Sequence, residues 1–259
     1  MSIKSSPWIV RRAPRDNASL RLFCFPHAGA GSVIFKDWYA DFGPNVDVCA
    51  IEPPGRLARR RDPMIRSLPE FVAALEPELE PYLDVPFVLF GYSLGAAMAF
   101  ESARALRRRR NLEPKHLIVA AARAPQLPRR LTAISQEPEP AFVRELERRY
   151  GPIEPVIKSD PEMLTLITEI MRVDLCMLEN YQYQAEPSFD CPVLAIGGTE
   201  DASLAPGELE GWSAHTSNAF RAQRLPGGHF FLRTAGKELR DLVRAQIQPA
   251  NPISAYATT

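Results

Sequence analysis

The chain has 259 residues, which is long enough for one large domain with a substantial hydrophobic core. Hydrophobic residues make up 46% and charged residues 24%, a composition that is ordinary for a folded protein and excludes an intrinsically disordered one. Lys plus Arg and Asp plus Glu each number 31, so no net charge favours nucleic acid or an anionic membrane as a partner.

The N-terminal segment lacks the apolar stretch of a signal peptide, and no run of about 18 apolar residues that would span a bilayer is present. We therefore expect a cytoplasmic protein with no membrane contact. The four cysteines show no C-x-x-C spacing, and Cys24, Cys49 and Cys191 lie in or beside apolar runs. This pattern favours reduced, buried thiols over disulfides or metal ligands.

Short runs that are apolar throughout recur along the chain, and such runs predict strands buried on both faces. Helix-like stretches lie between them. One begins with a capping box at Ser67 and Glu70, and another runs from Leu94 to Arg110. This alternation predicts an α/β fold with a mostly parallel sheet flanked by helices. The predicted strands are Leu20–Phe25, Val46–Ile51, Phe87–Phe90, Leu117–Ala121, Pro192–Ile196 and Phe220–Leu225.

The alternation is interrupted between residues 126 and 188, where the sequence contains no strand pattern. Two helical patterns occur there, Pro138–Tyr150 and Pro161–Tyr181, the second with Asp160 as its predicted N-cap. We expect residues 126–188 to form a helical lid insertion within a single domain, residues 1–259. An enlarged but ordinary crossover connection is the alternative.

The segment Gly91-Tyr92-Ser93-Leu94-Gly95 directly follows a predicted strand and directly precedes a predicted helix. A nucleophile on such a sharp turn adopts a strained backbone conformation, and small residues two positions away avoid a collision. We therefore predict that Ser93 is a catalytic nucleophile at the elbow of an α/β-hydrolase fold. The alternative is a tight packing turn in which the serine only caps the helix.

A serine nucleophile needs a general base, and four histidines are available. His229 lies in a Gly-rich loop after the last predicted strand, where α/β hydrolases carry their base. His116 begins a predicted strand and His215 lies in a polar stretch, so both are expected to be structural or solvated. His27 precedes the serine, where we expect it to shape a turn or contact substrate.

The base in turn needs a carboxylate to fix its tautomer. Two acids, Glu200 and Asp201, follow the predicted strand Pro192–Ile196. The order Ser, acid, His along the chain is that of α/β hydrolases. Asp201 is the predicted triad acid, and Glu200 remains an alternative.

Two backbone N–H groups are predicted to form the oxyanion hole. One belongs to Leu94, the residue after the nucleophile, and the other to Ala28, in the glycine-containing segment after Leu20–Phe25. Glycines there let the backbone turn its amides toward a carbonyl oxygen. A plain turn is the alternative.

Five segments occur in order along the chain: Phe25–Gly29, Pro53–Arg56, Phe90–Ala96, Arg123–Pro125 and Gly227–Phe231. Taken together, they resemble the motifs of the type II thioesterases that accompany nonribosomal peptide and polyketide synthases. The resemblance implies hydrolysis of acyl groups from the phosphopantetheine arm of carrier proteins, which removes stalled or misprimed chains. It also implies triad roles for Ser93, Asp201 and His229. The family elbow often reads G-H-S-M-G, whereas Tyr92 and Leu94 flank the serine here, which leaves the shape of the acyl pocket open.

No metal or organic cofactor is expected, because a triad and an oxyanion hole suffice for a thioester, and we expect a monomer. The expected partners are acylated carrier protein domains. The arginine runs Arg56–Arg61 and Arg107–Arg110 are candidates for docking them, although such runs are usually solvated.

A small-molecule esterase or lipase and a non-catalytic scaffold are the rival functions. The residues expected to contact substrate are His27, Tyr92, Met163, Ile167, Met171 and Phe230, and helical spacing in the lid suits core packing equally well.

Overall fold

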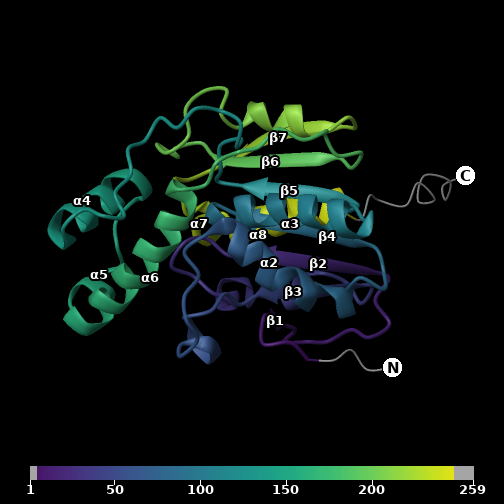
Figure 1. The fold of residues 1–259 in the computed structure, drawn as a ribbon, viewed down its shortest axis with the longest axis horizontal. Helices are drawn as coiled ribbons and strands as arrows, with labels where there is room; N and C mark the ends of the chain where they lie inside the picture. Colours follow the sequence, from purple (N-terminus) through teal and green to yellow (C-terminus); the bar gives the residue numbers. More distant parts are fainter. Residues whose placement is uncertain (1–4, 248–259) are drawn as a thin grey trace, which may run out of the picture.

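The computed structural model describes residues 5–247, which form a seven-stranded sheet with strand order β1-β3-β2-β4-β5-β6-β7. Only β1 pairs antiparallel, and the other strands are parallel (Figure 1). Every strand predicted from an apolar run is present to within two residues at each end, whereas β1, only two residues long, was not predicted. The strands are β1 Ile9–Val10, β2 Leu20–Phe25, β3 Val46–Ile51, β4 Phe87–Tyr92, β5 His116–Ala120, β6 Val193–Gly198 and β7 Phe220–Leu225.

Helices cover both faces of the sheet, so the α/β prediction is confirmed. Side chains of α2 and α3 pack on one face in one apolar core, and those of α1, α7 and α8 pack on the other face in a second. Successive residues of the parallel strands contribute to the two cores in turn, which explains their apolar character throughout. The helices are α1 Trp38–Asp41, α2 Leu68–Leu79, α3 Leu94–Arg110, α4 Glu139–Tyr150, α5 Pro155–Lys158, α6 Pro161–Glu179, α7 Phe231–Thr234 and α8 Gly236–Ile247; short 3₁₀ turns are η1 Ser32–Phe35, η2 Leu57–Arg59, η3 Glu80–Tyr82 and η4 Glu210–His215.

The predicted helix starts are confirmed by their caps. The Ser67 hydroxyl accepts the Glu70 N–H at the start of α2, and the Asp160 carboxylate accepts the N–H groups of Glu162 and Met163 at the start of α6. Each cap satisfies amide donors that the first turn of a helix leaves without an acceptor.

Between β5 and β6 the described chain contains helices α4, α5 and α6 and no named strand. Figure 1 shows these helices grouped at one end of the sheet, with α4 and α5 farthest from it. A small separate core of Ile134, Phe142, Leu146 and Leu175 joins α4 to α6. The expected insertion, residues 126–188, is therefore a unit that packs partly on itself.

All four cysteines are free thiols, as predicted, and Cys24, Cys49 and Cys191 are buried. Burial raises the pKa of the Cys191 thiol to about 12, which keeps it protonated and unreactive at neutral pH. No helix within residues 5–247 combines the length and the apolar character needed to cross a membrane.

Candidate active site

Ser93 stands between β4 and α3 in a strained backbone conformation, with φ of 55° and ψ of −117°. Its N–H donates to the Ala120 carbonyl of neighbouring β5 at 2.8 Å, which ties the turn to the sheet. A positive φ for a non-glycine residue persists only where the surroundings hold it. The turn therefore presents the Ser93 hydroxyl beyond the carboxyl end of β4.

The flanking glycines are required by close backbone contacts. A Cβ at Gly91 would overlap the Gly95 carbonyl, and a Cβ at Gly95 would overlap the Phe25 carbonyl at the end of β2. The obstacle is backbone in both cases, so no side-chain rotation relieves it. The spacing G-x-S-x-G is thus a steric consequence of the turn.

His229 links the serine to an acid through both of its ring nitrogens. Nε2 lies 3.0 Å from Ser93 Oγ, and Nδ1 lies 3.0 Å from Asp201 Oδ2. The histidine and the aspartate are both buried. The structure thus brings together the three side chains that the sequence predicted as a triad, in hydrogen-bonding geometry.

Asp201 is the acid beside the histidine, and its neighbour Glu200 is exposed. Burial alone would raise the pKa of Asp201, but the hydrogen bond from His229 and the imidazole charge outweigh it and bring that pKa below its usual value. Ser203 adds a second donor, because its hydroxyl lies 2.6 Å from Asp201 Oδ1 and 3.0 Å from His229 Nδ1. The carboxylate is therefore held ionised and oriented.

Close packing joins the loop that carries Asp201 to the loop that carries His229. We call the second of these, residues 226–230, the base loop. A Cβ at Gly198, at the end of β6, would overlap the carbonyls of Gly227 and Gly228. The Tyr92 hydroxyl donates to the His229 carbonyl at 2.5 Å and accepts the Leu232 N–H at 3.2 Å. The fully buried Tyr92 thus holds the base loop from beneath.

The two predicted oxyanion donors flank the serine. Ala28 follows β2, and Leu94 is the first residue of α3, whose first-turn amides have no acceptor inside the helix. Both residues line a small apolar cavity that also contains Ser93 and His229. Their position relative to Ser93 suits a pair of donors facing one carbonyl oxygen.

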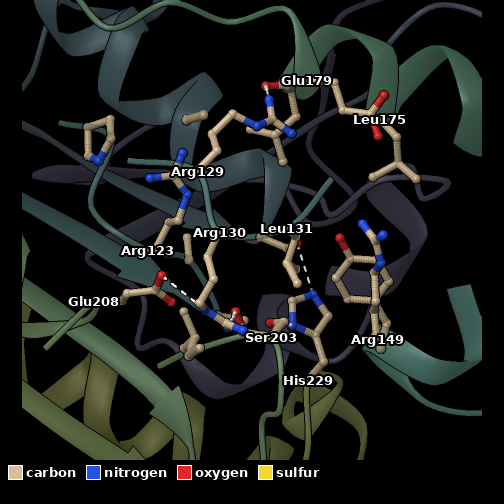
Figure 2. A pocket seen from close by; sticks show the side chains of 18 of the residues that line it. Arg123, Arg129, Arg130, Leu131, Arg149, Leu175, Glu179, Ser203, Glu208 and His229 are labelled. Atoms are coloured by element: carbon tan, nitrogen blue, oxygen red, sulfur yellow. Dashed lines mark hydrogen bonds and ion pairs between the residues drawn. The ribbon is translucent and has the colours of Figure 1, made fainter. Parts of the chain in front are cut away.

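Two cavities open onto Ser93 and His229. The larger, of about 120 Å³, contains several arginines, and Figure 2 shows Arg123, Arg129 and Arg130 on one side of it, with His229 and Arg149 on the other. The smaller, of about 20 Å³, is apolar. Tyr150, Leu175 and Leu178 of the insertion line both cavities, and the Tyr150 ring lies 4.7 Å from the His229 ring.

Some residues expected to contact substrate lie elsewhere. His27, Met171 and Phe230 line the small cavity, as expected, but Tyr92, Met163 and Ile167 line neither cavity. The hydroxyl of Tyr92 is engaged with the base loop, and Met163 lies on the exposed first turn of α6. Sequence reasoning missed Tyr150, Leu175 and Ser203 as lining residues, because nothing in their local pattern distinguishes them from core or surface positions.

The remaining histidines have structural roles. His215 is buried, packs against Phe100 and Trp212, and its Nε2 lies 2.6 Å from the Gln126 side-chain oxygen. Burial and the charge of Arg104 lower the pKa of His215 to about 4. His116 begins β5, and its Nδ1 lies 3.2 Å from Gln246.

The arginine runs are largely neutralised within the chain. Arg107–Arg110 at the end of α3 form ion pairs with acids of α2 and of nearby segments, and buried Arg56 pairs with buried Asp174 of α6. Buried Arg59 pairs with Asp62 and lies over the Trp8 ring. The paired arginines are therefore less available for docking than the sequence suggested, whereas Arg60 and Arg61 are exposed. The partners of Arg107–Arg110 are Glu76, Glu80, Glu113 and Glu186.

The fold and the arrangement of Ser93, His229 and Asp201 define the class of this protein as the α/β hydrolases. A family model described as a thioesterase domain matches residues 20–247. The chain is 34% identical to gramicidin S biosynthesis protein GrsT of Aneurinibacillus migulanus, over 93% of this chain and 94% of that protein. It is also 34% identical to thioesterase PikA5 of Streptomyces venezuelae, over 92% of this chain and 85% of that protein.

Known structures agree with this assignment. The type II thioesterase BorB from the borrelidin biosynthetic cluster superimposes with a TM-score of 0.86 at 29% identity, covering 95% of this chain and all of that one. The RedJ thioesterase of prodiginine biosynthesis in Streptomyces coelicolor gives a TM-score of 0.84 at 31% identity, covering 90% and 92%. The chain belongs to the thioesterase domain family, as a type II thioesterase. The predicted family, fold and enzyme class are thereby confirmed.

The contact between Tyr92 and the base loop generates a first prediction. Tyr92→Phe leaves the buried His229 carbonyl and Leu232 N–H without their hydroxyl partner, which we expect to cost about 1–3 kcal/mol of unfolding free energy. The loosened base should also lower kcat while KM stays unchanged, since Tyr92 lines neither cavity. Tyr39→Phe is the matched control, because that hydroxyl donates to the Val10 carbonyl away from the site and its loss should affect only stability. Denaturant unfolding and steady-state kinetics measure both effects, and an unchanged kcat in Tyr92→Phe would contradict the prediction.

Proposed function

We propose that this thioesterase hydrolyses acyl groups from the phosphopantetheine arm of carrier proteins in a nonribosomal peptide or polyketide pathway, and so clears stalled or misprimed chains. The observation that carries the proposal is the chain of contacts from Ser93 Oγ through His229 to Asp201, at 3.0 Å for each step. The biosynthetic setting of the relatives, gramicidin S for one and borrelidin for another, supports the choice of substrate class.

In the proposed mechanism, Ser93 Oγ attacks the thioester carbonyl carbon while its proton passes to His229 Nε2. The carbon–sulfur bond then breaks, and the departing sulfur takes that proton to leave as a thiol. Water next attacks the acyl-serine, gives a proton to His229, and releases a carboxylic acid as the proton returns to Ser93. The N–H groups of Ala28 and Leu94 stabilise the negative oxygen formed in both steps.

Asp201 holds His229 with its Nδ1 protonated and Nε2 free to accept the serine proton. The depressed pKa of Asp201 keeps it charged at neutral pH, where it stabilises the imidazolium formed during attack. Ser203 donates to the other carboxylate oxygen and fixes the plane of the acid. We assign Ser203 a supporting role and no direct contact with substrate.

The two cavities suit the two halves of the substrate. The oxyanion donors line the small apolar cavity, which suits a short acyl group. The larger cavity contains His229 and arginines, which suits a leaving arm that must receive a proton near Ser93 and carries a phosphate at its far end. Helices α4 and α6 of the insertion line both cavities through Tyr150 and Leu175, so the insertion acts as a lid that limits water.

The proposed substrate class is tested by comparing turnover of an acyl carrier protein thioester with that of a free ester of the same acyl chain. We expect the carrier thioester to be preferred, the acyl group to be trapped on Ser93 by mass spectrometry, and Ser93→Ala to lose both activities. A preference for the free ester would identify a small-molecule esterase. Failure of a fluorophosphonate to label Ser93 in the folded protein would indicate a non-catalytic scaffold.

The two neighbouring acids provide a matched pair of variants. Asp201→Asn retains the shape of the side chain but disfavours the productive tautomer of His229, and we expect kcat to fall by about 10³- to 10⁴-fold. Glu200→Gln removes a charge from the adjacent exposed residue and should change kcat less than about twofold. Steady-state hydrolysis of one acyl carrier protein substrate measures both, and equal losses would remove the distinction between the two acids.

The small cavity should set acyl length. Met171→Ala enlarges this cavity. The ratio of kcat/KM for a hexanoyl thioester to kcat/KM for an acetyl thioester should therefore rise by about tenfold or more, since one buried methylene is worth about 1–3 kcal/mol. The ratio between two substrates cancels any general loss of activity. Met163→Ala makes the same substitution on the same helix outside both cavities and should leave the ratio unchanged. An unchanged ratio in Met171→Ala would place the acyl chain elsewhere.

A further inference from the structure

A buried carboxylate of the lid contacts the segment that supplies the predicted oxyanion donor. We call residues 27–31 the oxyanion loop. Asp174 of α6 is 2% exposed, and its Oδ2 accepts the Gly29 N–H at 2.7 Å. The same oxygen accepts from Arg56 Nη2, and Arg56 Nη1 donates to the Pro54 carbonyl at 2.7 Å. One lid side chain thus joins the oxyanion loop to the loop after β3.

The peptide between Ala28 and Gly29 is held at both of its polar atoms. Asp174 accepts its N–H, and His27 Nδ1 lies 2.8 Å from its carbonyl oxygen. Burial lowers the pKa of His27 to about 4, so the ring is neutral at pH 7, and the carbonyl partner puts its proton on Nδ1. Holding this peptide plane restrains ψ of Ala28, and through the Ala28 backbone it restrains the direction of the Ala28 N–H.

A second contact from the same helix reaches the same residue. Gly29 has φ of 80°, and a Cβ there would lie 2.7 Å from Met171 Cγ. Met171 and Asp174 are three residues apart on α6, so both project from one face of the helix. The lid helix therefore contacts the oxyanion loop at Gly29 through an apolar side chain and through a carboxylate.

Without α6 in this position, the Arg56 guanidinium and the Gly29 N–H would lose their common acceptor. A buried charge without its partner is costly, so the arrangement favours a seated helix. A charged acceptor also makes a stronger hydrogen bond to an amide than a neutral one. The contact therefore restrains the orientation of the loop.

We propose that Asp174 is a positioning residue for thioester hydrolysis, which orients the Ala28 N–H toward the oxyanion only when lid helix α6 is seated on the oxyanion loop. This inference rests on the proposed function, because it takes the Ala28 N–H as an oxyanion donor. Assembly of the oxyanion hole is thereby coupled to lid position, and a displaced α6 yields an enzyme that retains its triad but stabilises the tetrahedral intermediate poorly.

The effect of Asp174→Ala on kcat is compared with its effect on KM. Removing one oxyanion donor costs about 10²- to 10³-fold in kcat, so loss of its orientation in Asp174→Ala should cost about 10- to 100-fold, with KM within about threefold. Asp174→Asn retains a carbonyl oxygen that can accept the Gly29 N–H, so it should recover part of the loss. Hydrolysis of one acyl carrier protein thioester measures these values.

Two acyl-pantetheine analogues distinguish a misoriented Ala28 N–H from a general loss of substrate binding in Asp174→Ala. A trifluoromethyl ketone forms a bond from Ser93 Oγ to its carbonyl carbon, passes the serine proton to His229, and leaves an oxyanion in the hole. Its inhibition constant should rise in Asp174→Ala by the same factor as kcat/KM falls. A thioether analogue, which cannot be attacked, should bind with an unchanged Kd. A parallel loss for both analogues would overturn the inference.

A double variant guards against misfolding. Arg56→Met with Asp174→Val replaces the buried pair by apolar side chains of comparable total volume, an exchange that is often neutral or stabilising. It still removes the acceptor for the Gly29 N–H, so we expect a normal melting temperature and a kcat as low as in Asp174→Ala. A folded double variant with full kcat and an unchanged trifluoromethyl ketone constant would refute the positioning role.

Arg172→Gln is the matched control on the same helix. Arg172 donates to the Ser135 carbonyl at 2.8 Å and lies over the Phe142 ring, so it joins α6 only to other parts of the insertion. Its loss should lower kcat less than about twofold. A decrease in kcat equal to that of Asp174→Ala would mean that any loosening of the lid has the same effect, which would contradict the positioning role.

Ser93→Ala separates the two proposals. Residual turnover in that variant refutes the proposed function, whereas an inactive Ser93→Ala beside a fully active Asp174→Ala refutes only the positioning role.

Discussion

Ser93 is held at a positive φ because the backbone around it is packed against the two neighbouring strands of the sheet. Such a conformation costs about 1–3 kcal/mol, and β2 and β5 on either side of β4 provide the contacts that hold it. Gly95 touches the end of β2, and the Ser93 N–H is bonded to the end of β5. The central position of β4 is therefore a requirement for the strained conformation of Ser93, and the sheet serves as its support.

Most of the sheet and the three contacting side chains could be predicted because their signals are local. A strand buried on both faces must be apolar throughout, so runs such as Val46–Ile51 predict its bounds closely. The elbow at Ser93 follows from steric needs that span only five residues. His229 and Asp201 were found because parallel strands carry their following loops to one edge of the sheet, and few suitable residues occur after β6 and β7.

The sequence did not indicate which side chains of α6 reach the cavity or the oxyanion loop, because this depends on contacts between residues far apart in the chain. Met163, Ile167 and Met171 share one helical stripe, so the pattern does not distinguish them, but α6 is 19 residues or about 28 Å long and extends past the cavity at its first turns. Only Met171 lies beside Ser93. The contacts of Asp174 could not be predicted, because its partners Arg56 and Gly29 are distant in the chain and only the fold brings them together.

Ser93 and His229 line both cavities, and this imposes an order of events on the proposed reaction. The Tyr150 and Phe230 rings lie 4.7 and 5.2 Å from the His229 ring, and the larger cavity also borders this histidine. If the pantetheine arm occupies that cavity, as proposed, the hydrolytic water reaches the acyl-serine only after the free thiol has departed. The carrier would then dissociate before the acid is released, which is the sequence of a ping-pong enzyme whose second substrate is solvent.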